Sequence, residues 1–345
     1  MNVKTKIVYG GLQELGRELT KEEWQKASFT ILLDENTFRL CLPLLISQVG
    51  ALQEAEFIEV PVGEDCKCLE VVTQVWQTLM DNDSDRQSVI LNLGGGSICD
   101  LGGFVAAGYK RGIRYINVPT TLLSMVDASI GGKTAIDFGG VKNSIGHFWP
   151  SDLTVIEPMF LDTLPPTEFL CGQMEMVKTA AVTDANLYHY LTSPSARYLS
   201  QIKQVARLKN RVVKFDPYDH SIRKILNFGH TFGHAMEIYS SLPHGIAVGI
   251  GMKVAMYLST KKLGLSEEVY RNYSQWLKNQ LLSINSQLLS FNLREIESML
   301  PLMRQDKKNE GDLLRCVLLQ EVGAPVIDVY VDDNEVRDAF LKTCR

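Results

Sequence analysis

The sequence has little of several features that would assign it to a specialised class of protein. None of its apolar runs is long enough to span a membrane, and its first residues lack the apolar core of a signal peptide. The seven cysteines are odd in number and scattered, and the closest pair, Cys66 and Cys68, fits no common zinc spacing. We therefore expect a cytoplasmic protein with reduced thiols and no membrane partner.

The sequence also has no large excess of positive or negative charge. The formal net charge is −5 over 345 residues, so there is no basic field that would favour nucleic acid as a partner. Internal repeats and low-complexity tracts are missing as well, which excludes repeat architectures. The positive charges gather in short compact motifs instead, and this pattern indicates a small anionic ligand.

The pattern of predicted elements changes near residue 160. Before it, strand-like and helical patterns alternate, at 29–33, 37–49, 57–60, 67–80, 89–93, 97–109, 115–118 and 153–156. This alternation predicts a parallel, doubly wound sheet. After it come helical patterns at 167–180, 183–192, 196–215, 222–239, 245–263, 266–284, 293–303 and 333–342, with a strand pair near 314–331. We expect an α/β domain over residues 1–160 and a mainly α-helical domain over 161–345.

The α/β half contains a glycine-rich turn at a position where such proteins bind nucleotides. An apolar run at 88–93 leads into three glycines at 94–96, and a helical pattern begins at Ser97. This order offers backbone N–H groups to a pyrophosphate, although the spacing is not G-x-G-x-x-G and also fits a simple tight turn. Thr120 and Thr121 follow the next strand, and two hydroxyls at the carboxyl end of a strand independently indicate a ligand site at the same edge of the sheet.

The helical half contains residues typical of a divalent metal site. In NFGHTFGHA, His230 and His234 are four apart and share one face of the predicted helix, and we expect the neighbouring glycines to open space there. His244 follows, and Glu175 lies on an earlier helix with Lys178 one turn later. These groups suit Zn²⁺ or a similar ion, although such a histidine pair is also found in ordinary packing. The spacing does not separate His230 from His234.

Eight cations lie in compact motifs, although any one of them alone is more typical of a solvated surface. They are Arg111, Lys133, Lys142, Lys178, Lys209, Arg223, Lys307 and Lys308. Gathered beside a nucleotide and a metal, they would form a pocket for a polyanion. Asp100, Asp127 and Asp219 would then supply acid–base or orienting carboxylates, and Asp100 also fits an acid favoured by a helix dipole.

Taken together, these motifs resemble those of the 3-dehydroquinate synthases. In chain order they are GGGSICDLGGF, YKRG, VPTTLLSMVDASIGGKTAID, VKNSIGHF, LNFGHTFGHAME, HGIAVGIGM and RQDKK, between about Ile31 and Lys308. The wider sugar-phosphate cyclases share many of the motifs, and iron-dependent alcohol and glycerol dehydrogenases share the fold more loosely. The resemblance implies a Rossmann-like NAD-binding domain followed by a helical domain that binds metal and substrate.

The resemblance also implies which residues bind NAD and a metal ion, Zn²⁺ or Co²⁺. The metal ligands would be Glu175, His230 and His244, and His234 would lie near the substrate phosphate. The positions that match the family's NAD contacts are Asp34, Asn36, Glu64, Lys67, Gly95, Gly96, Ser97, Asp100, Thr120, Thr121, Asp127, Lys142, Phe160 and Thr163.

The implied substrate is 3-deoxy-D-arabino-heptulosonate 7-phosphate. Its phosphate would contact Lys133, Asn143, Asn227, His234 and either Lys307 or Lys308, with Arg111 reaching across a homodimer interface. Its carboxylate would contact Lys209 and Arg223. The implied reaction oxidises the C5 hydroxyl with NAD, eliminates phosphate, reduces the ketone, opens the ring and closes it by an aldol step. The net reaction is a phosphate lyase step of chorismate and aromatic amino acid biosynthesis, because NAD is regenerated.

Three positions depart from the family pattern. Asp219 stands where a proton-accepting Glu is expected, Ser221 replaces a glycine, and Ile246 replaces a Glu close to His244. The alternatives are a cyclase for another sugar such as sedoheptulose 7-phosphate, a metal- and NAD-dependent polyol dehydrogenase, and an inactive NAD-binding protein. Lys209 and Arg223 favour a substrate that carries a carboxylate, the cations of KNSIG and RQDKK favour a phosphorylated one, and the intact ligand set argues against inactivity.

Overall fold

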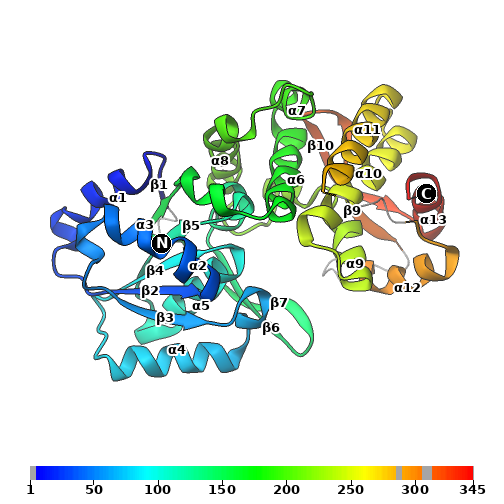
Figure 1. The fold of residues 1–345 in the computed structure, drawn as a ribbon. Coiled ribbons are helices and arrows are strands. Elements are labelled where there is room, and N and C mark those ends of the chain that lie inside the picture. The colour runs from blue at the N-terminus through cyan, green and yellow to red at the C-terminus, as the bar shows by residue number, and fades with distance from the viewer. Residues whose placement is uncertain (1–4, 285–289, 305–312, 345) are drawn as a thin grey trace. The chain divides into compact units, whose positions relative to one another are not determined.

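The chain forms two compact units in the computed structural model, Met1–Leu164 and Pro165–Arg345 (Figure 1). The structure describes residues 5–284, 290–304 and 313–344. The second unit begins at Pro165-Pro166, and Pro166 is the first residue of a helix, a position that needs no backbone N–H. Among the described residues, no helix is long and apolar enough to cross a membrane.

Unit 1 is built on a parallel six-stranded sheet, as the alternating pattern predicted. From edge to edge the strands are β1 (Lys6–Val8), β8 (Leu153–Val155), β5 (Arg114–Pro119), β4 (Val89–Gly94), β2 (Phe29–Asp34) and β3 (Glu56–Val60). The central strand β4 is buried along its whole length, so its sequence is apolar without alternation. Its one polar side chain, Asn92, donates to the Asn117 side chain of β5 at 2.9 Å.

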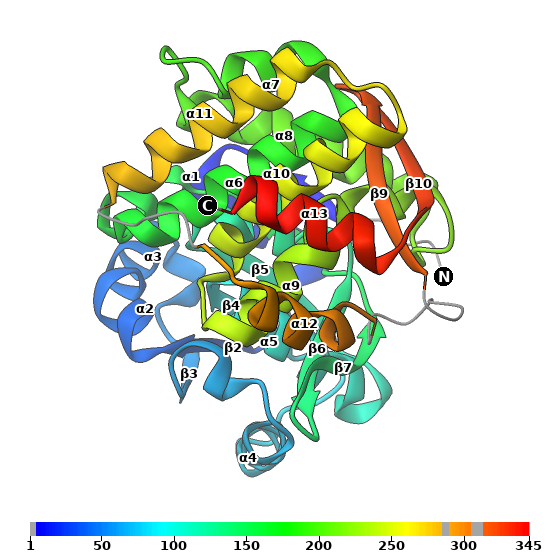
Figure 2. The same cartoon turned by 90° about the vertical axis from the view of Figure 1, so that its right-hand side faces the viewer.

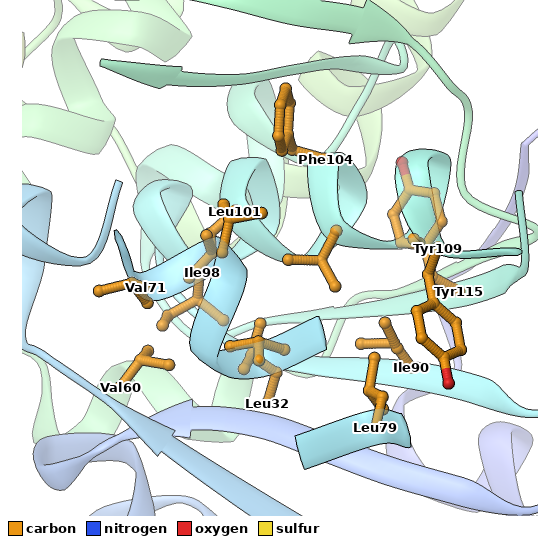
Figure 3. Packing of buried hydrophobic residues seen from close by; sticks show 14 of the residues in the cluster. Leu32, Val60, Val71, Leu79, Ile90, Ile98, Leu101, Phe104, Tyr109 and Tyr115 are labelled. Carbon is orange, nitrogen blue, oxygen red and sulfur yellow. The ribbon is translucent and has the colours of Figure 1, made fainter. Parts of the chain in front are cut away.

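Most helices of unit 1 contact this sheet. The helices of this unit are α1 (Gly11–Leu19), α2 (Glu35–Leu40), α3 (Leu42–Gln48), α4 (Leu69–Asp81) and α5 (Gly96–Gly108). Among them, α3 packs against α1 and α2. Figure 3 shows Leu32 and Ile90 of the sheet in one buried cluster with Val71 of α4 and Ile98 and Leu101 of α5. The single helix predicted over 37–49 is wrong, because the chain breaks at Cys41 and restarts ahead of Pro43 as α3.

A β-hairpin follows the sheet's fifth strand in sequence, and the sequence patterns did not predict it. Its strands are β6 (Lys133–Phe138) and β7 (Val141–Phe148), which pair antiparallel. The turn between them is Gly139-Gly140, and both glycines have positive φ, 61° and 76°, as a two-residue hairpin turn needs. Nearly all of β7 is exposed, so it lacks the alternation that marks a half-buried strand.

Unit 2 is mainly helical. Its elements are α6 (Pro166–Thr183), α7 (Ala185–Leu191), α8 (Tyr198–Phe215), α9 (His230–Ser240), α10 (His244–Lys262), α11 (Glu267–Ser283), α12 (Leu293–Arg304), β9 (Leu314–Glu321), β10 (Ala324–Val331) and α13 (Asp333–Thr343). The central helix α10 contacts α6, α9, α11, α13 and β9 (Figure 2), which explains why it is apolar on all sides.

The single helix predicted over 222–239 is wrong, and the difference matters for the site. A 3-10 helix covers Ile222–Asn227, the chain turns at Gly229 with φ of 80°, and α9 starts at His230. A side chain at Gly229 would overlap Met252 of α10, and one at Gly233 would press on the backbone of Ala247. These glycines therefore bring α9 close to α10. The expectation that they open space at the helix surface is wrong.

Candidate active site

In unit 1, the glycine turn and the paired threonines lie together. Strands β4 and β5 are neighbours in register up to Gly94 and Pro119, and the Thr120 N–H donates to the Gly94 carbonyl at 2.9 Å. Gly95 is the N-cap of α5, and it has no side chain to accept hydrogen bonds from the first turn. The N–H groups at the start of α5 are therefore oriented to bind an anion at the carboxyl edge of the sheet.

A buried lysine connects several of the predicted positions next to this turn. The Lys67 ammonium donates to Asp100 Oδ2 at 2.9 Å and to Asn143 Oδ1 at 2.5 Å, and it lies 3.6 Å from Glu64 Oε2. Glu64 in turn accepts from the Ser97 hydroxyl at 2.6 Å. Burial opposes the charge, but the carboxylates of Asp100 and Glu64 raise the pKa of Lys67, so the ammonium stays protonated.

This lysine cluster (Glu64, Lys67, Ser97, Asp100, Asn143) joins residues for which the family resemblance implied different roles. Asn143 was predicted to contact substrate phosphate, and the other four were predicted to contact NAD. Asn143 has a left-handed backbone with φ of 52°, and its N–H donates to Asp137 Oδ1 at 2.7 Å. The hairpin therefore holds Asn143 in a fixed conformation beside Lys67.

Some other predicted positions of unit 1 have visible structural roles. Asp34 caps α2 by accepting from the Thr37 N–H at 2.8 Å, while Asn36 is exposed. The Thr121 hydroxyl accepts from the Ser124 N–H at 3.1 Å, where the helical turn Ser124–Ala128 that contains Asp127 begins. Phe160 is buried in a 3-10 helix, Pro158–Thr163, that ends at Thr163. Gly96, Lys142 and Lys133 lie at the start of α5, β7 and β6.

In unit 2, the predicted metal ligands come together around one buried carboxylate. Glu175 of α6 is fully buried, and its Oε1 lies 3.7 Å from His230 Nε2 and 3.4 Å from His244 Nε2. Both carboxylate oxygens lack a hydrogen-bond partner among the described residues, although the Lys178 ammonium forms an ion pair with Oε2. A buried carboxylate beside imidazole nitrogens is a suitable donor set for a divalent ion.

His234 completes a triangle of imidazoles. Ring centroids of His230, His234 and His244 lie 5.1–5.6 Å apart, and one ring nitrogen from each falls within 4.8 Å of the others. His234 is the exposed member, on the turn of α9 that follows His230. The three rings could thus hold a metal in another combination, but Glu175 is at ion-pair distance from His230 and His244.

Hydrogen bonds orient the two rings that face Glu175. His230 Nδ1 lies 3.2 Å from the Phe228 carbonyl, so that nitrogen carries the proton and Nε2 presents its lone pair. Burial, assisted by the Lys178 ammonium, holds the pKa of His230 well below its usual value, which keeps it neutral. For His244, burial acts in the same direction, but Glu175 and Glu237 outweigh it and raise the pKa to about 10.

The predicted carboxylate-binding cations are buried in unit 2. Lys209 lies on α8 and Arg223 in the 3-10 helix that α8 contacts, and both side chains are buried. Asp216 Oδ2 accepts from the Arg223 N–H at 3.1 Å, and Arg223 Nη1 donates to the Pro217 carbonyl at 2.8 Å. Asn227, at the end of that helix, is exposed. Lys307 and Lys308 lie outside the described residues.

Sequence comparisons place these residues in a known family. Models of the N-terminal and C-terminal parts of 3-dehydroquinate synthase match residues 57–171 and 172–309. A 3-dehydroquinate synthase from Parabacteroides distasonis is 37% identical over 324 residues, which cover 91% of this chain and 89% of the relative. The chain belongs to the 3-dehydroquinate synthase family. The family's enzyme from Dictyoglomus turgidum is 36% identical and aligns over 93% of this chain and 90% of its own.

Solved structures of related cyclases share the fold of this 3-dehydroquinate synthase family member. The 2-epi-5-epi-valiolone synthase from Streptomyces hygroscopicus subsp. jinggangensis 5008, with NAD⁺ and Zn²⁺ bound, matches with a TM-score of 0.83 at 25% identity, covering 99% of this chain and 97% of that one. A 2-deoxy-scyllo-inosose synthase complexed with carbaglucose-6-phosphate, NAD⁺ and Co²⁺ matches with a TM-score of 0.85 at 22% identity, covering 98% and 97%. The second likeness shows the fold alone.

The structure accommodates all three departures from the family pattern. Ser221 has φ of −142°, outside the left-handed region, so no glycine is needed there. Ile246 is buried in α10, where an apolar side chain packs well. Asp219 has a left-handed backbone with φ of 59°, a conformation that Asp adopts more readily than most residues.

Two residues of the site were missed in the sequence. Glu237 accepts from His244 Nδ1 at 2.9 Å, and Asp216 accepts from the N–H groups of His220 and Ser221 at 3.0 and 2.6 Å. Asp216 precedes Pro217, and Asp-Pro is a recognisable turn signal. Glu237 is the last residue of the motif LNFGHTFGHAME, but no role was predicted for it, because its contact with His244 depends on the angle at which α10 follows α9.

Proposed function

We propose that this protein is a 3-dehydroquinate synthase, which converts 3-deoxy-D-arabino-heptulosonate 7-phosphate to 3-dehydroquinate and phosphate with catalytic NAD and a divalent metal, Zn²⁺ or Co²⁺. The observation that carries the proposal is the buried Glu175 with His230 and His244, found in a chain 36–40% identical to enzymes of that name. The reaction would serve the shikimate pathway to aromatic amino acids. A cytoplasmic location agrees with the seven cysteines, which are all free.

The proposed NAD site is the carboxyl edge of the sheet in unit 1. The start of α5 would bind the pyrophosphate through backbone N–H groups, with no side chain at Gly95 to obstruct it. The lysine cluster would line the site, because Ser97 and Asp100 lie on the first turns of the same helix. Lys67 would hold Asp100 and Asn143 in place for cofactor and substrate.

The proposed metal ligands are Glu175, His230 and His244. A divalent ion bound there would act as a Lewis acid on vicinal substrate oxygens, which lowers the pKa of an alcohol and polarises the ketone formed from it. The chain has already arranged the donors, since the Phe228 carbonyl and Glu237 orient the two rings so that each Nε2 faces Glu175. Lys178 would balance the charge of Glu175.

The remaining proposed residues bind and orient the substrate. Lys209 and Arg223 would bind its carboxylate, and burial strengthens such charge-assisted contacts. Lys133, Asn143, Asn227, His234 and one of Lys307 or Lys308 would bind the phosphate. Asp219 would accept a proton, through a water if its shorter side chain does not reach the substrate. A set of fixed cations would keep the phosphate in place as charge develops on it.

A homodimer with Arg111 acting across the interface is part of the proposal. Arg111 is exposed and lies in a left-handed stretch, Lys110–Gly112, with φ values of 47°, 69° and 105°. Such strained backbone is common where a side chain must be presented in a fixed direction. Mixing Arg111→Ala with Lys133→Ala protein and allowing subunits to exchange should restore activity, because one site in each mixed dimer is complete. No restoration would contradict the cross-subunit role.

The test of the function is product analysis with metal-loaded protein and a catalytic amount of NAD. We expect phosphate and 3-dehydroquinate in equal amounts from 3-deoxy-D-arabino-heptulosonate 7-phosphate, with no accumulation of NADH. Sedoheptulose 7-phosphate, which lacks the carboxylate, should be a poor substrate because Lys209 and Arg223 would be left without their anion. Preferential turnover of the latter sugar would instead identify another sugar-phosphate cyclase, and steady NADH release would identify a dehydrogenase.

A further inference from the structure

The two histidines that face Glu175 are held by different kinds of group. His230 is fixed by a neutral main-chain carbonyl, that of Phe228, at 3.2 Å from Nδ1. His244 is fixed by a carboxylate, Glu237 Oε2, at 2.9 Å from Nδ1. His230 is the better buried of the two, whereas the His244 side chain is 35% exposed. The more exposed ring, that of His244, therefore has the charged hydrogen-bond acceptor, and the more buried ring of His230 has the neutral one.

The turn between α9 and α10 places Glu237 beside His244. Glu237 lies on α9 and His244 is the first residue of α10, so they come from consecutive helices. The connection reverses direction at Ser241, which has a left-handed φ of 51°. Gly251 keeps the two helices close, because a side chain there would press on Gly233 of α9. The Glu237 side chain is 11% exposed, so solvent competes little for its carboxylate.

We propose that Glu237 is a positioning residue for the metal site, an inference that rests on the proposed function. Its carboxylate accepts a hydrogen bond from His244 Nδ1, which fixes the orientation of the ring with Nε2 directed to Glu175 Oε1, 3.4 Å away, where a bound metal would take the place of the Nε2 proton. An ionised partner also makes the imidazole a better electron donor. Ile246, two residues after His244 on α10, is buried and apolar and offers no carboxylate. The carboxylate that contacts His244 Nδ1 is that of Glu237 on α9.

The test is metal affinity in Glu237 variants. Zn²⁺ binding would be measured by competition with a chromophoric chelator, and the ligand field by the visible spectrum of the Co²⁺ form. We expect Glu237→Ala to bind Zn²⁺ about 10–100-fold more weakly, as is typical when the carboxylate behind a ligating histidine is lost. Glu237→Gln should lose less, because its amide oxygen still accepts from Nδ1 although it carries no charge. The Co²⁺ spectrum should change in the alanine variant.

A matched control is Glu267→Ala. Glu267 forms an exposed ion pair with Lys261 at 3.1 Å, so its removal takes a glutamate from the surface of the same unit. The control should keep the metal affinity and Co²⁺ spectrum of the unchanged protein. A purely structural role for Glu237 would lower thermal stability and leave both of these readouts unmoved.

The outcomes separate this inference from the proposed function. If the unchanged protein binds no divalent metal, the proposed function itself fails. If it binds Zn²⁺ and both Glu237 variants bind it equally tightly, the positioning role alone is overturned. Should Glu237→Ala fail to fold by circular dichroism, Glu237→Gln decides by the same criterion. Weaker binding by Glu237→Gln supports the role, and unchanged binding contradicts it.

Discussion

The two units handle their buried charges in opposite ways. In unit 1, the Lys67 ammonium is surrounded by groups that it can contact directly, Asp100, Asn143 and Glu64, so the cluster is complete as the protein folds. In unit 2, Glu175 is fully buried and its Oε2 forms an ion pair with the Lys178 ammonium, but among the described residues neither oxygen makes a well-formed hydrogen bond. A divalent ion bound between Glu175 and the two imidazoles would use the carboxylate as a ligand. Unit 1 thus has its charges paired without a ligand, and unit 2 keeps donors available for a metal.

The largest expected effect is that of Glu175→Gln. Metal binding should be lost, while NAD affinity stays unchanged because the cofactor site belongs to unit 1. The metal-free protein should also be less stable by about 3–5 kcal/mol, since the Lys178 ammonium stays buried without its carboxylate. Denaturant unfolding and a metal titration would measure both effects.

The double variant Glu175→Gln, Lys178→Met sharpens this result. Removing the second buried charge should recover much of the lost stability without recovering metal binding. If the double variant were as unstable as Glu175→Gln alone, the loss would come from packing and not from charge. The comparison between the units would then lose its electrostatic basis.

The next effect concerns how closely the helices of the metal site pack. Gly245 of α10 lies against the Cys171 backbone of α6, one turn before Glu175, and a methyl group there would overlap it. Gly245→Ala should therefore destabilise unit 2 by about 1–3 kcal/mol and weaken metal binding, because it separates His244 from Glu175. Gly50→Ala, which meets nothing within 4 Å, is the matched control for thermal unfolding. Equal melting temperatures for the two variants would contradict the close packing.

Lys67→Met tests the claim that unit 1 is organised by its own ion pairs. The substitution removes a charged donor to Asp100 and Asn143, a loss of roughly 1.5–3 kcal/mol for hydrogen bonds of this kind. We expect weaker NAD binding, measured by calorimetry, and unchanged Zn²⁺ binding. A variant that binds NAD normally would show that the cluster does not organise the cofactor site.

The smallest expected effect is that of Asp216→Asn, which loosens the loop that presents Arg223. Burial opposes ionisation of Asp216, but the N–H groups of His220, Ser221 and Arg223 lower its pKa to about 2. Its contribution to stability is therefore present above about pH 4, the unfolded value, and is lost as the pH falls through about 2. The variant should lose about 1 kcal/mol at neutral pH and raise KM more than it lowers kcat. If Asp216→Asn had the same stability as the unchanged protein at neutral pH and lost the same amount on acidification, this role would be contradicted.

How much the sequence could predict differs between the same two regions. The parallel sheet could be predicted because short apolar runs such as that of β4 alternate with helical patterns, an order typical of a sheet covered by helices. The exposed hairpin β6–β7 did not follow, since its side chains are not sorted between a core and solvent. Gly229 and Gly233 were identified as special, but whether a glycine opens space or removes it depends on the neighbouring helix, which no local pattern reveals. The contact between Glu237 and His244 was hidden for the same reason.

The most direct measurement of the account's central claim is to remove the metal with a chelator and titrate Co²⁺ back while phosphate release is followed. We predict that turnover is lost on removal and returns in proportion to the added metal, until one ion is bound per chain. Glu175→Gln should show no recovery under the same conditions. Full activity of the metal-stripped protein, or full recovery by Glu175→Gln, would contradict a catalytic metal site at Glu175, His230 and His244.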